Sequence, residues 1–425
     1  MSSDLALFSN KKTVTAPWPK WPIMGDIEIQ AITDIIENKS LSVLRKESVI
    51  AEFEDAFSEK FGCQYALSFS SGTASIHAAC FASGVGPGWE VLTPSYTWIS
   101  AITAILHGNG TPIFCDLKKN TFHIDPEEIL RKATPRTKAV IVCHTWGIPA
   151  PMDEIMDAAQ QKGLKVIEDA SHCHGGKYKG DYLGTIGDIG CFSLQASKSL
   201  SAGEGGILVT NEKLFYERAM IPGHHDMRLK QCLSLPETKI FKNAGGYWKY
   251  RAAPLEMALA CSQLPHLDEW NSIKLSNYAR LENHLKELPF LDFPTLESNS
   301  ERGFYSSPCL YNYDQDLVSR DTFLEALWAE GAIVFPGYDE NWYQTPILQN
   351  MDLFRQMWVD SYPNGTQYTP LPPGSLPNTD NIVKRTITIP SWGHPAITLV
   401  DQYASAFHKL AQNMDKLADY QHNKN

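Results

Sequence analysis

The chain has 425 residues, a length typical of two or three domains or of one large α/β domain with a smaller companion. Hydrophobic residues make up 43% and charged residues 20%, which excludes a globally disordered chain. The formal net charge is −11 and the basic residues are scattered, so nucleic acid is not expected as a partner. No apolar run approaches the ~20 residues of a membrane span, and residues 1–15 hold no secretory signal.

Nine cysteines occur without any C-x-x-C pair, and most of them lie inside apolar runs such as Ile141–Cys143. This usage is typical of buried, reduced thiols rather than of a disulfide framework. We therefore expect a cytoplasmic α/β protein that does not associate with membranes.

The first half of the chain predicts an alternation of strands and helices. Prolines and tryptophans predict an extended arm over residues 1–25, and apolar residues at helical spacing predict helices over 26–38 and 47–61. From residue 65 the alternation predicts a mostly parallel sheet that is covered on both faces. The expected strands are 65–69, 90–93, 112–116, 139–143 and 165–169, and the expected helices between them are 73–83, 97–107, 125–133 and 153–162.

The second half of the chain is expected to include a smaller domain. Residues 254–288 are amphipathic and predict a helical stretch, and a boundary is expected near 285–295. The chain would then comprise an arm (1–25), a large domain (26–290) and a small C-terminal domain (291–425). Other expected elements are strands at 188–194, 206–210, 306–312, 332–335 and 385–389, helices at 320–330 and 397–418, and a surface loop over 362–383.

Three segments could carry chemistry. Ser70–Ala74 joins a strand to a helix, where backbone N–H groups can hold a phosphate or simply form a turn. Asp169 ends a strand and could bind a ligand or cap the next helix. Lys198 lies between an apolar strand and the glycine-rich stretch 203–206, so it is either a surface charge or an amine with a lowered pKa that forms a Schiff base.

Together these segments match the needs of pyridoxal phosphate. This cofactor needs an amine for its aldehyde, an anion at its pyridine nitrogen, and N–H and hydroxyl donors for its phosphate. A metal is not expected, because neither H-E-x-x-H nor a carboxylate-rich loop accompanies His172 and His174.

The order of these motifs resembles the DegT/DnrJ/EryC1/StrS aminotransferases, and the resemblance covers nearly the whole chain. It implies pyridoxal phosphate fold type I, like aspartate aminotransferase, with a mostly parallel seven-stranded sheet in the large domain and a smaller α+β C-terminal domain. The motifs are Ser-Gly-Thr-Ala (71–74), Pro-Ser-Tyr-Thr-Trp (94–98), Glu-Asp-Ala-Ser-His (168–172), Gly-Asp (187–188), Phe-Ser-Leu-Gln (192–195), Gly-Glu-Gly-Gly (203–206), Arg251, Gln-Leu (263–264) and the stretch 377–390.

The resemblance also implies a role for each site residue. Lys198 would carry the cofactor as a Schiff base and then transfer a proton, and Asp169 would pair with the pyridinium nitrogen. The remaining roles are stacking on the cofactor ring by Trp98, phosphate binding by Gly72, Thr73 and Ser193, and a place beside the ring and its 3′-oxygen for His172 and Gln195.

The residues around Lys198 indicate which branch of the family the chain resembles. Gln195, three residues before the lysine, is similar to the scyllo-inosose aminotransferases and the 3-amino-5-hydroxybenzoate synthases, several of which use glutamine as donor. A lysine here argues against the sugar-dehydratase branch, which has histidine. We expect an acceptor that is a keto-cyclitol or a keto-sugar, in the biosynthesis of amino sugars, aminocyclitols or antibiotics.

The chain departs from the family pattern at Lys249, where an asparagine usually reaches the cofactor phosphate of the neighbouring subunit. Lys249 could bind the same phosphate, lie in solvent or meet an acidic group of the substrate. Other polar residues could contact the acceptor, with metal binding near 224–226 as a weaker alternative. These substrate residues are His224, His225, Tyr247 and Arg251.

The leading hypothesis is therefore a homodimer with shared active sites that moves an amino group from glutamine or glutamate to a keto group. One alternative is a lyase, a dehydratase or a carbon–carbon bond-forming enzyme that uses the same cofactor. Another is a cofactor-binding protein without turnover, which the presence of both Lys198 and Asp169 disfavours.

Overall fold

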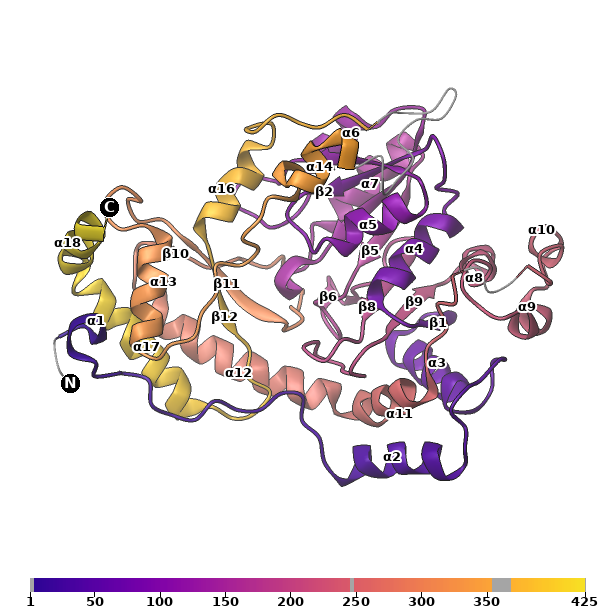
Figure 1. Ribbon diagram of the computed structural model, residues 1–425, viewed down its shortest axis with the longest axis horizontal. Helices are drawn as coiled ribbons and strands as arrows, with labels where there is room; N and C mark the ends of the chain where they lie inside the picture. Colours follow the sequence, from indigo (N-terminus) through magenta and orange to yellow (C-terminus); the bar gives the residue numbers. More distant parts are fainter. Residues whose placement is uncertain (1–3, 245–247, 354–367, 425) are drawn as a thin grey trace.

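A computed structural model describes residues 4–244, 248–353 and 368–424. Its centre is a seven-stranded sheet with the order β1-β9-β8-β5-β4-β2-β3 (Figure 1). Within this sheet β9 runs opposite to the other six strands, so the carboxyl ends of those six lie at one edge. The predicted mostly parallel sheet is thus confirmed. The strands are β1 (Tyr65–Phe69), β2 (Glu90–Pro94), β3 (Thr111–Cys115), β4 (Thr137–Cys143), β5 (Lys165–Asp169), β8 (Ile189–Ser193) and β9 (Gly206–Thr210).

Helices cover both faces of this sheet because alternate residues of each strand point to opposite faces. In β4, Val140 and Val142 pack into one core, whereas Ala139 and Ile141 pack into the other. The first core includes α3 (Ser48–Phe61), α6 (Pro126–Lys132), α7 (Met152–Lys162) and α11 (Pro254–Gln263), and the second includes α4 (Gly72–Ala82), α5 (Ser100–His107) and α8 (Lys213–Met220).

A smaller antiparallel sheet has the order β10-β11-β12 and its own core. The long helix α12 (Leu267–Leu285) extends from the large sheet to this smaller one (Figure 1). The predicted boundary after residue 290 falls between α12 and β10, and the division into domains stays a prediction. The elements here are β10 (Leu291–Asp292), β11 (Ser306–Tyr311), β12 (Thr386–Pro390), α13 (Arg320–Ala329), α16 (Pro377–Arg385), α17 (Ile397–Ala411) and α18 (Met414–Lys424).

Two predictions of irregular structure are wrong because long-range contacts stabilise short helices. In the arm, Ala6–Ser9 forms α1, where Ala6 N–H donates to Glu330 Oε1 at 2.7 Å. In the expected loop over 362–383, α16 begins at Pro377, and Asp116 accepts the N–H groups of Asn378 and Thr379. Residues 362–367 of that loop lie outside the described residues.

Two predicted elements of the small unit also differ. The helix expected over 397–418 is divided into α17 and α18, and the strand expected over 332–335 is reduced to a bridge between Phe335 and Thr388. In the described part of the chain, no helix is long and apolar enough to cross a membrane. Further elements are α2 (Asp26–Glu37), α9 (Asp226–Cys232), α10 (Pro236–Lys239), α14 (Pro346–Gln349), β6 (Lys177–Tyr178) and β7 (Asp181–Tyr182), with 3₁₀ turns at Thr145–Gly147, Leu264–His266 and Trp342–Gln344.

Candidate active site

Loops from five strands meet at the carboxyl edge of the large sheet. They follow β1, β2, β4, β5 and β8, and they carry most of the predicted site residues. Neighbouring parts of this edge touch one another: Thr97 Oγ1, after β2, donates to Sγ of Cys143 at the end of β4 at 3.0 Å, and a Cβ added to Gly72 at the start of α4 would lie 2.8 Å from Ser193 Cβ at the end of β8. Open α/β sheets bind their ligands at this edge.

Lys198 lies on the loop between β8 and β9. Burial lowers the pKa of its amine to about 8, while the charge of Asp169 acts in the opposite direction. The amine lies 4.1 Å from the centre of the Tyr305 ring. Its backbone is held at both ends, because the N–H donates to Gln195 O at 2.8 Å and the carbonyl accepts from Trp21 Nε1 at 3.1 Å. An amine with a lowered pKa is neutral often enough near neutral pH to attack a carbonyl group.

Asp169 is the last residue of β5 and is buried. Its carboxylate accepts the N–H of Ser171 at 3.1 Å, and it forms no ion pair within 4.0 Å among the residues that the structure describes. Its charge acts on Lys198. The carboxylate therefore retains acceptor capacity for a positively charged N–H group brought by a ligand.

Glu168 supports Asp169 from the other face of β5. Its buried carboxylate accepts hydrogen bonds from the backbone N–H groups of Gly184, Ile186 and Gly187 and from His144 Nε2 at 2.9 Å. The Nδ1 atom of His144 accepts the N–H of Ala150, so the proton of this imidazole is on Nε2. This network fixes the loop between β7 and β8 beside the site.

The ring of His172 lies flat against that of Tyr305, the residue before β11. The two rings stack with centres 4.0 Å apart and an interplanar angle of 8°. The Nδ1 atom of His172 accepts the N–H of Trp146 at 3.2 Å. Burial, followed by the charge of Lys198, holds the pKa of His172 well below its usual value, so the imidazole is neutral.

Three aromatic residues that were not predicted from the sequence form a cluster of rings with His172, namely Trp146, Tyr305 and Tyr338. Trp146 follows β4 with φ 60°, a conformation that bulky residues rarely adopt, and its ring lies 4.6 Å from that of Tyr338. The same search of strand ends that found Asp169 would have found Trp146. Tyr305 and Tyr338 come from the C-terminal part of the chain, where no local pattern indicates them.

The helix α4 presents its N-terminus to the same edge. The side chain of Ser71 caps the helix by accepting the N–H of Ala74 at 3.1 Å. The amides of Gly72 and Thr73 precede the first intrahelical hydrogen bond, and Ser193 lies against Gly72. N–H and hydroxyl groups in this arrangement suit a phosphate.

Two more of the predicted cofactor residues, Trp98 and Gln195, lie at the same edge. Trp98 follows β2 and is 57% exposed, with its ring 6.4 Å from that of Tyr338, so one face is available to a ligand. Gln195 follows β8, and its Oε1 accepts both the N–H and the hydroxyl of Ser197, at 2.8 and 2.6 Å.

Lys249 lies on a short segment whose backbone is hydrogen-bonded on both sides of this residue. The flanking residues Trp248 and Tyr250 donate their N–H groups to Pro222 O and Gly223 O, at 3.0 and 2.9 Å. Lys249 itself has φ 50° and an exposed side chain. Tyr247, one of the predicted substrate residues, lies outside the described residues.

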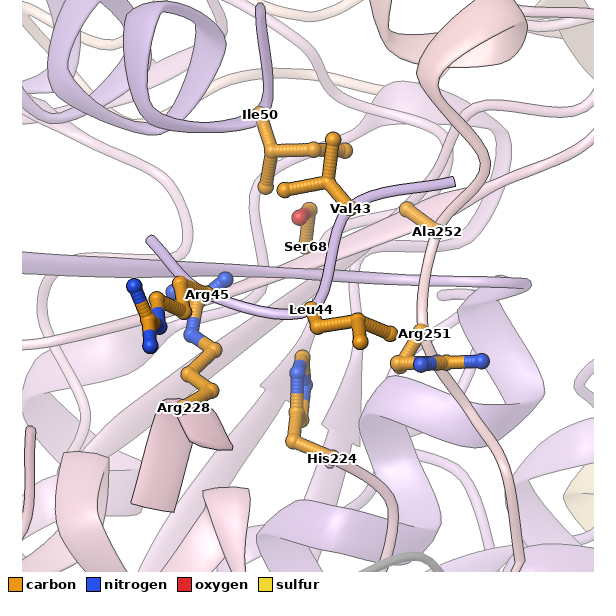
Figure 2. A pocket seen from close by; sticks show the side chains of 9 residues that line it. All are labelled: Val43, Leu44, Arg45, Ile50, Ser68, His224, Arg228, Arg251 and Ala252. Carbon is orange, nitrogen blue, oxygen red and sulfur yellow. The ribbon is translucent and has the colours of Figure 1, made fainter. Parts of the chain in front are cut away.

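Two further predicted substrate residues, His224 and Arg251, line a small cavity together with Ser68 of β1 (Figure 2). Its volume of about 10 Å³ suits one water molecule. His225 is partly exposed instead, and its Nδ1 caps α9 by accepting the N–H of Met227. In the part of the chain that the structure describes, no group of three histidine, cysteine or acidic side chains could hold a metal ion. The remaining residues of the cavity are Val43, Leu44, Arg45, Ile50, Arg228 and Ala252.

The sheet and the groups at its edge define the class of this protein. A seven-stranded, mostly parallel sheet with a smaller C-terminal unit is the fold of the type I pyridoxal phosphate enzymes. The donor set fits that cofactor, since it combines a buried amine with a carboxylate and helix N-terminal amides that have no cationic or hydrogen-bonding partner, respectively, in the described part of the chain.

Comparison with known proteins identifies the family. The model of the DegT/DnrJ/EryC1/StrS aminotransferase family matches residues 22–405. The chain belongs to this family and is an aminotransferase, and both the expected family and the expected branch are confirmed. Aminotransferases of this family depend on pyridoxal phosphate.

Two relatives and one solved structure illustrate the likeness. A protein of Streptoalloteichus tenebrarius with the provisional name L-glutamine:3-amino-2,3-dideoxy-scyllo-inosose aminotransferase is 30% identical, over 98% of this chain and 100% of its own. The L-glutamine:2-deoxy-scyllo-inosose aminotransferase of Streptomyces lividus is 31% identical, over 82% of this chain and 83% of its own. The crystal structure of an aminotransferase from Psychrobacter cryohalolentis superposes with a TM-score of 0.81 at 24% identity, over 94% of this chain and all of that chain.

Proposed function

We propose that this aminotransferase uses pyridoxal phosphate to move an amino group from glutamine or glutamate to the keto group of a cyclitol or sugar. The observation that carries the proposal is the meeting of Lys198, Asp169 and the N-terminus of α4 at one edge of the sheet. The cofactor, when bound, supplies an aldehyde that accepts an amine and a ring that withdraws electrons.

The residues at this edge would hold the cofactor by its three functional parts. Lys198 would take the aldehyde carbon through its amine, and Asp169 would accept a hydrogen bond from the ring nitrogen. His172, held neutral by its burial, and the exposed face of Trp98 are flat surfaces for the ring. The phosphate would lie at the amides of Gly72 and Thr73 and the hydroxyl of Ser193, and Gln195 would lie near the ring oxygen.

Lys198 would also move the proton in the reaction. Burial lowers its pKa to about 8, which is close to the pH of most cells. A general base is most effective when its pKa lies near the working pH. The backbone bonds to Gln195 and Trp21 hold the base of the side chain, and Nζ forms no hydrogen bond or ion pair with the residues that the structure describes.

The identity of donor and acceptor rests on the relatives. The names of both relatives give L-glutamine as the donor and a deoxygenated scyllo-inosose as the acceptor. We infer a cyclitol ketone as acceptor for this chain, in the biosynthesis of aminocyclitols or other specialised metabolites. Contacts of the acceptor with the predicted residues His224, His225, Tyr247 and Arg251 remain predictions.

We further propose a homodimer in which Lys249 completes the site of the partner. The exposed side chain of Lys249 on a segment with a hydrogen-bonded backbone supports this proposal, as does the exposed ring of Trp248 beside it. Sedimentation would test the proposal. A monomer that binds the cofactor with full affinity would contradict it.

The nine cysteines are free thiols, and six of them are buried. Free thiols are typical of proteins in a reducing compartment, and we propose that this compartment is the cytoplasm.

The reaction itself is tested by mixing the cofactor-loaded chain with L-glutamine and following its visible absorbance. Transamination predicts a shift from the aldehyde form of the cofactor to its amine form. The absence of any shift with glutamine or glutamate would favour the alternative, a lyase or dehydratase that uses the same cofactor.

A further inference from the structure

A second buried lysine lies beneath the loop that carries Lys198. Lys274 belongs to α12 and is 3% exposed, and it forms no ion pair within 4.0 Å among residues 4–244, 248–353 and 368–424. Burial lowers the pKa of its amine to about 7. An amine in such a place is costly unless polar or aromatic groups surround it.

The contacts of Lys274 lead to the backbone of Lys198. Its Nζ donates to Ser199 Oγ at 2.9 Å and to Phe304 O at 3.3 Å, and it lies 4.0 Å from the centre of the Trp21 ring. The indole of Trp21 in turn donates to Lys198 O at 3.1 Å. Trp21 and Lys274 therefore bind two successive residues of the loop, Lys198 and Ser199 respectively. The side chains of Trp21 and Lys274 also contact each other.

This cluster joins three parts of the molecule to the loop. Trp21 belongs to the N-terminal arm, and Phe304 leads into β11 of the smaller sheet. One turn after Lys274 on the same helix, Asn277 donates to Trp392 O and His394 O, at 2.9 and 2.8 Å. The position of the Lys198 loop is thus linked to α12 and to the smaller sheet.

Stability alone does not account for a lysine at this position. Ser199 Oγ donates to Phe304 O at 2.9 Å, so it would keep an acceptor if Lys274 were replaced by a methionine of similar length. No donor would be left without a partner, and a buried charge would be removed. Because an unpaired buried charge is itself costly, this replacement is not expected to reduce stability.

We propose that Lys274 is a positioning residue that acts together with Trp21 to fix the backbone of Lys198 while the Lys198 side chain moves. This inference rests on the proposed function, because it assumes that Lys198 carries the cofactor. The lysine is needed for the contact with Ser199, and the indole N–H is needed for the contact with Lys198 O.

The test follows the loading of pyridoxal phosphate onto the full-length chain after its removal, by the rate at which the visible band appears. Lys274→Met and Trp21→Phe should each slow loading about tenfold, because a small displacement of a reacting group has an effect of this size. Lys274→Arg should restore most of the rate. Trp270→Phe is the matched control, since Trp270 packs edge-on against Trp21 at 5.4 Å and forms no hydrogen bond with the loop.

Thermal unfolding separates positioning from packing. We expect Lys274→Met to keep a Tm within about 4 °C of the unmodified chain. A normal loading rate in Lys274→Met would overturn the inference, and so would equal slowing in Trp270→Phe and Trp21→Phe. If Lys274→Met fails to fold, Trp21→Phe and Lys274→Arg still decide the question. A wild-type chain that never forms the band would instead overturn the proposed function, and the inference with it.

Discussion

Replacement of Glu168 by glutamine is expected to destabilise the folded chain by about 3–6 kcal/mol. Oε1 accepts the N–H groups of Ile186 and Gly187 at 2.8 and 2.6 Å, and Oε2 accepts that of Gly184 at 2.8 Å and His144 Nε2 at 2.9 Å. In glutamine one oxygen becomes an NH₂ group, which faces two donors and can accept from neither. Two bonds to a charged acceptor are then lost, at about 1.5–3 kcal/mol each.

Urea unfolding at neutral pH, followed by tryptophan fluorescence, measures this difference in the free energy of unfolding. Glu59→Gln is the control, because Glu59 is exposed on α3 and should change stability by less than about 0.5 kcal/mol. The expected loss is a large part of the total stability of about 5–15 kcal/mol that is usual for folded proteins. A loss below about 1 kcal/mol in Glu168→Gln would refute the assignment of four bonds to one carboxylate.

Three further predictions concern cofactor binding and acid stability. Gly72→Ala would place a Cβ 2.8 Å from Ser193 Cβ, so the affinity for pyridoxal phosphate, measured by fluorescence titration, should fall about tenfold. Gly86→Ala is the control, because its Cβ would meet no atom within 4 Å and the affinity should not change. Burial lowers the pKa of His123 from its usual 6.5 to about 3 in the folded chain, so the unfolded chain binds the additional proton first as the pH falls. The free energy of unfolding should therefore fall by up to about 1.4 kcal/mol per pH unit between about pH 6.5 and pH 3. His123→Gln should flatten this fall, and an unchanged slope would count against the burial of a neutral His123. Lys249→Ala should weaken cofactor binding about tenfold and reduce its salt dependence, and unchanged binding would place Lys249 in solvent.

The sequence predicted the groups whose signals are local. Asp169 ends an apolar strand, and Lys198 lies between such a strand and a run of glycines, so topology alone brings both to the ligand-binding edge of the sheet. Tyr305 could not be predicted in this way, because its contact with His172 joins residues more than a hundred positions apart. The same holds for α16, whose first turn is stabilised by Asp116, the residue after β3.

Lys274 shows a second limit of sequence reasoning. It has helical neighbours and no motif around it, so it would be classed as an ordinary surface lysine. Only the fold reveals that it is buried and that its amine touches Ser199 and the ring of Trp21. Two lysines with lowered pKa therefore lie near one loop, and an experiment must distinguish them.

Reduction with borohydride of the chain loaded with pyridoxal phosphate, followed by peptide mass spectrometry, shows directly which lysine carries the cofactor. It fixes the cofactor to whichever amine carries it. We expect the phosphopyridoxyl group on Lys198, absent in Lys198→Ala and still on Lys198 in Lys274→Met. A label on Lys274, or a label spread over exposed lysines without preference, would contradict the role of Lys198 as the cofactor-carrying residue.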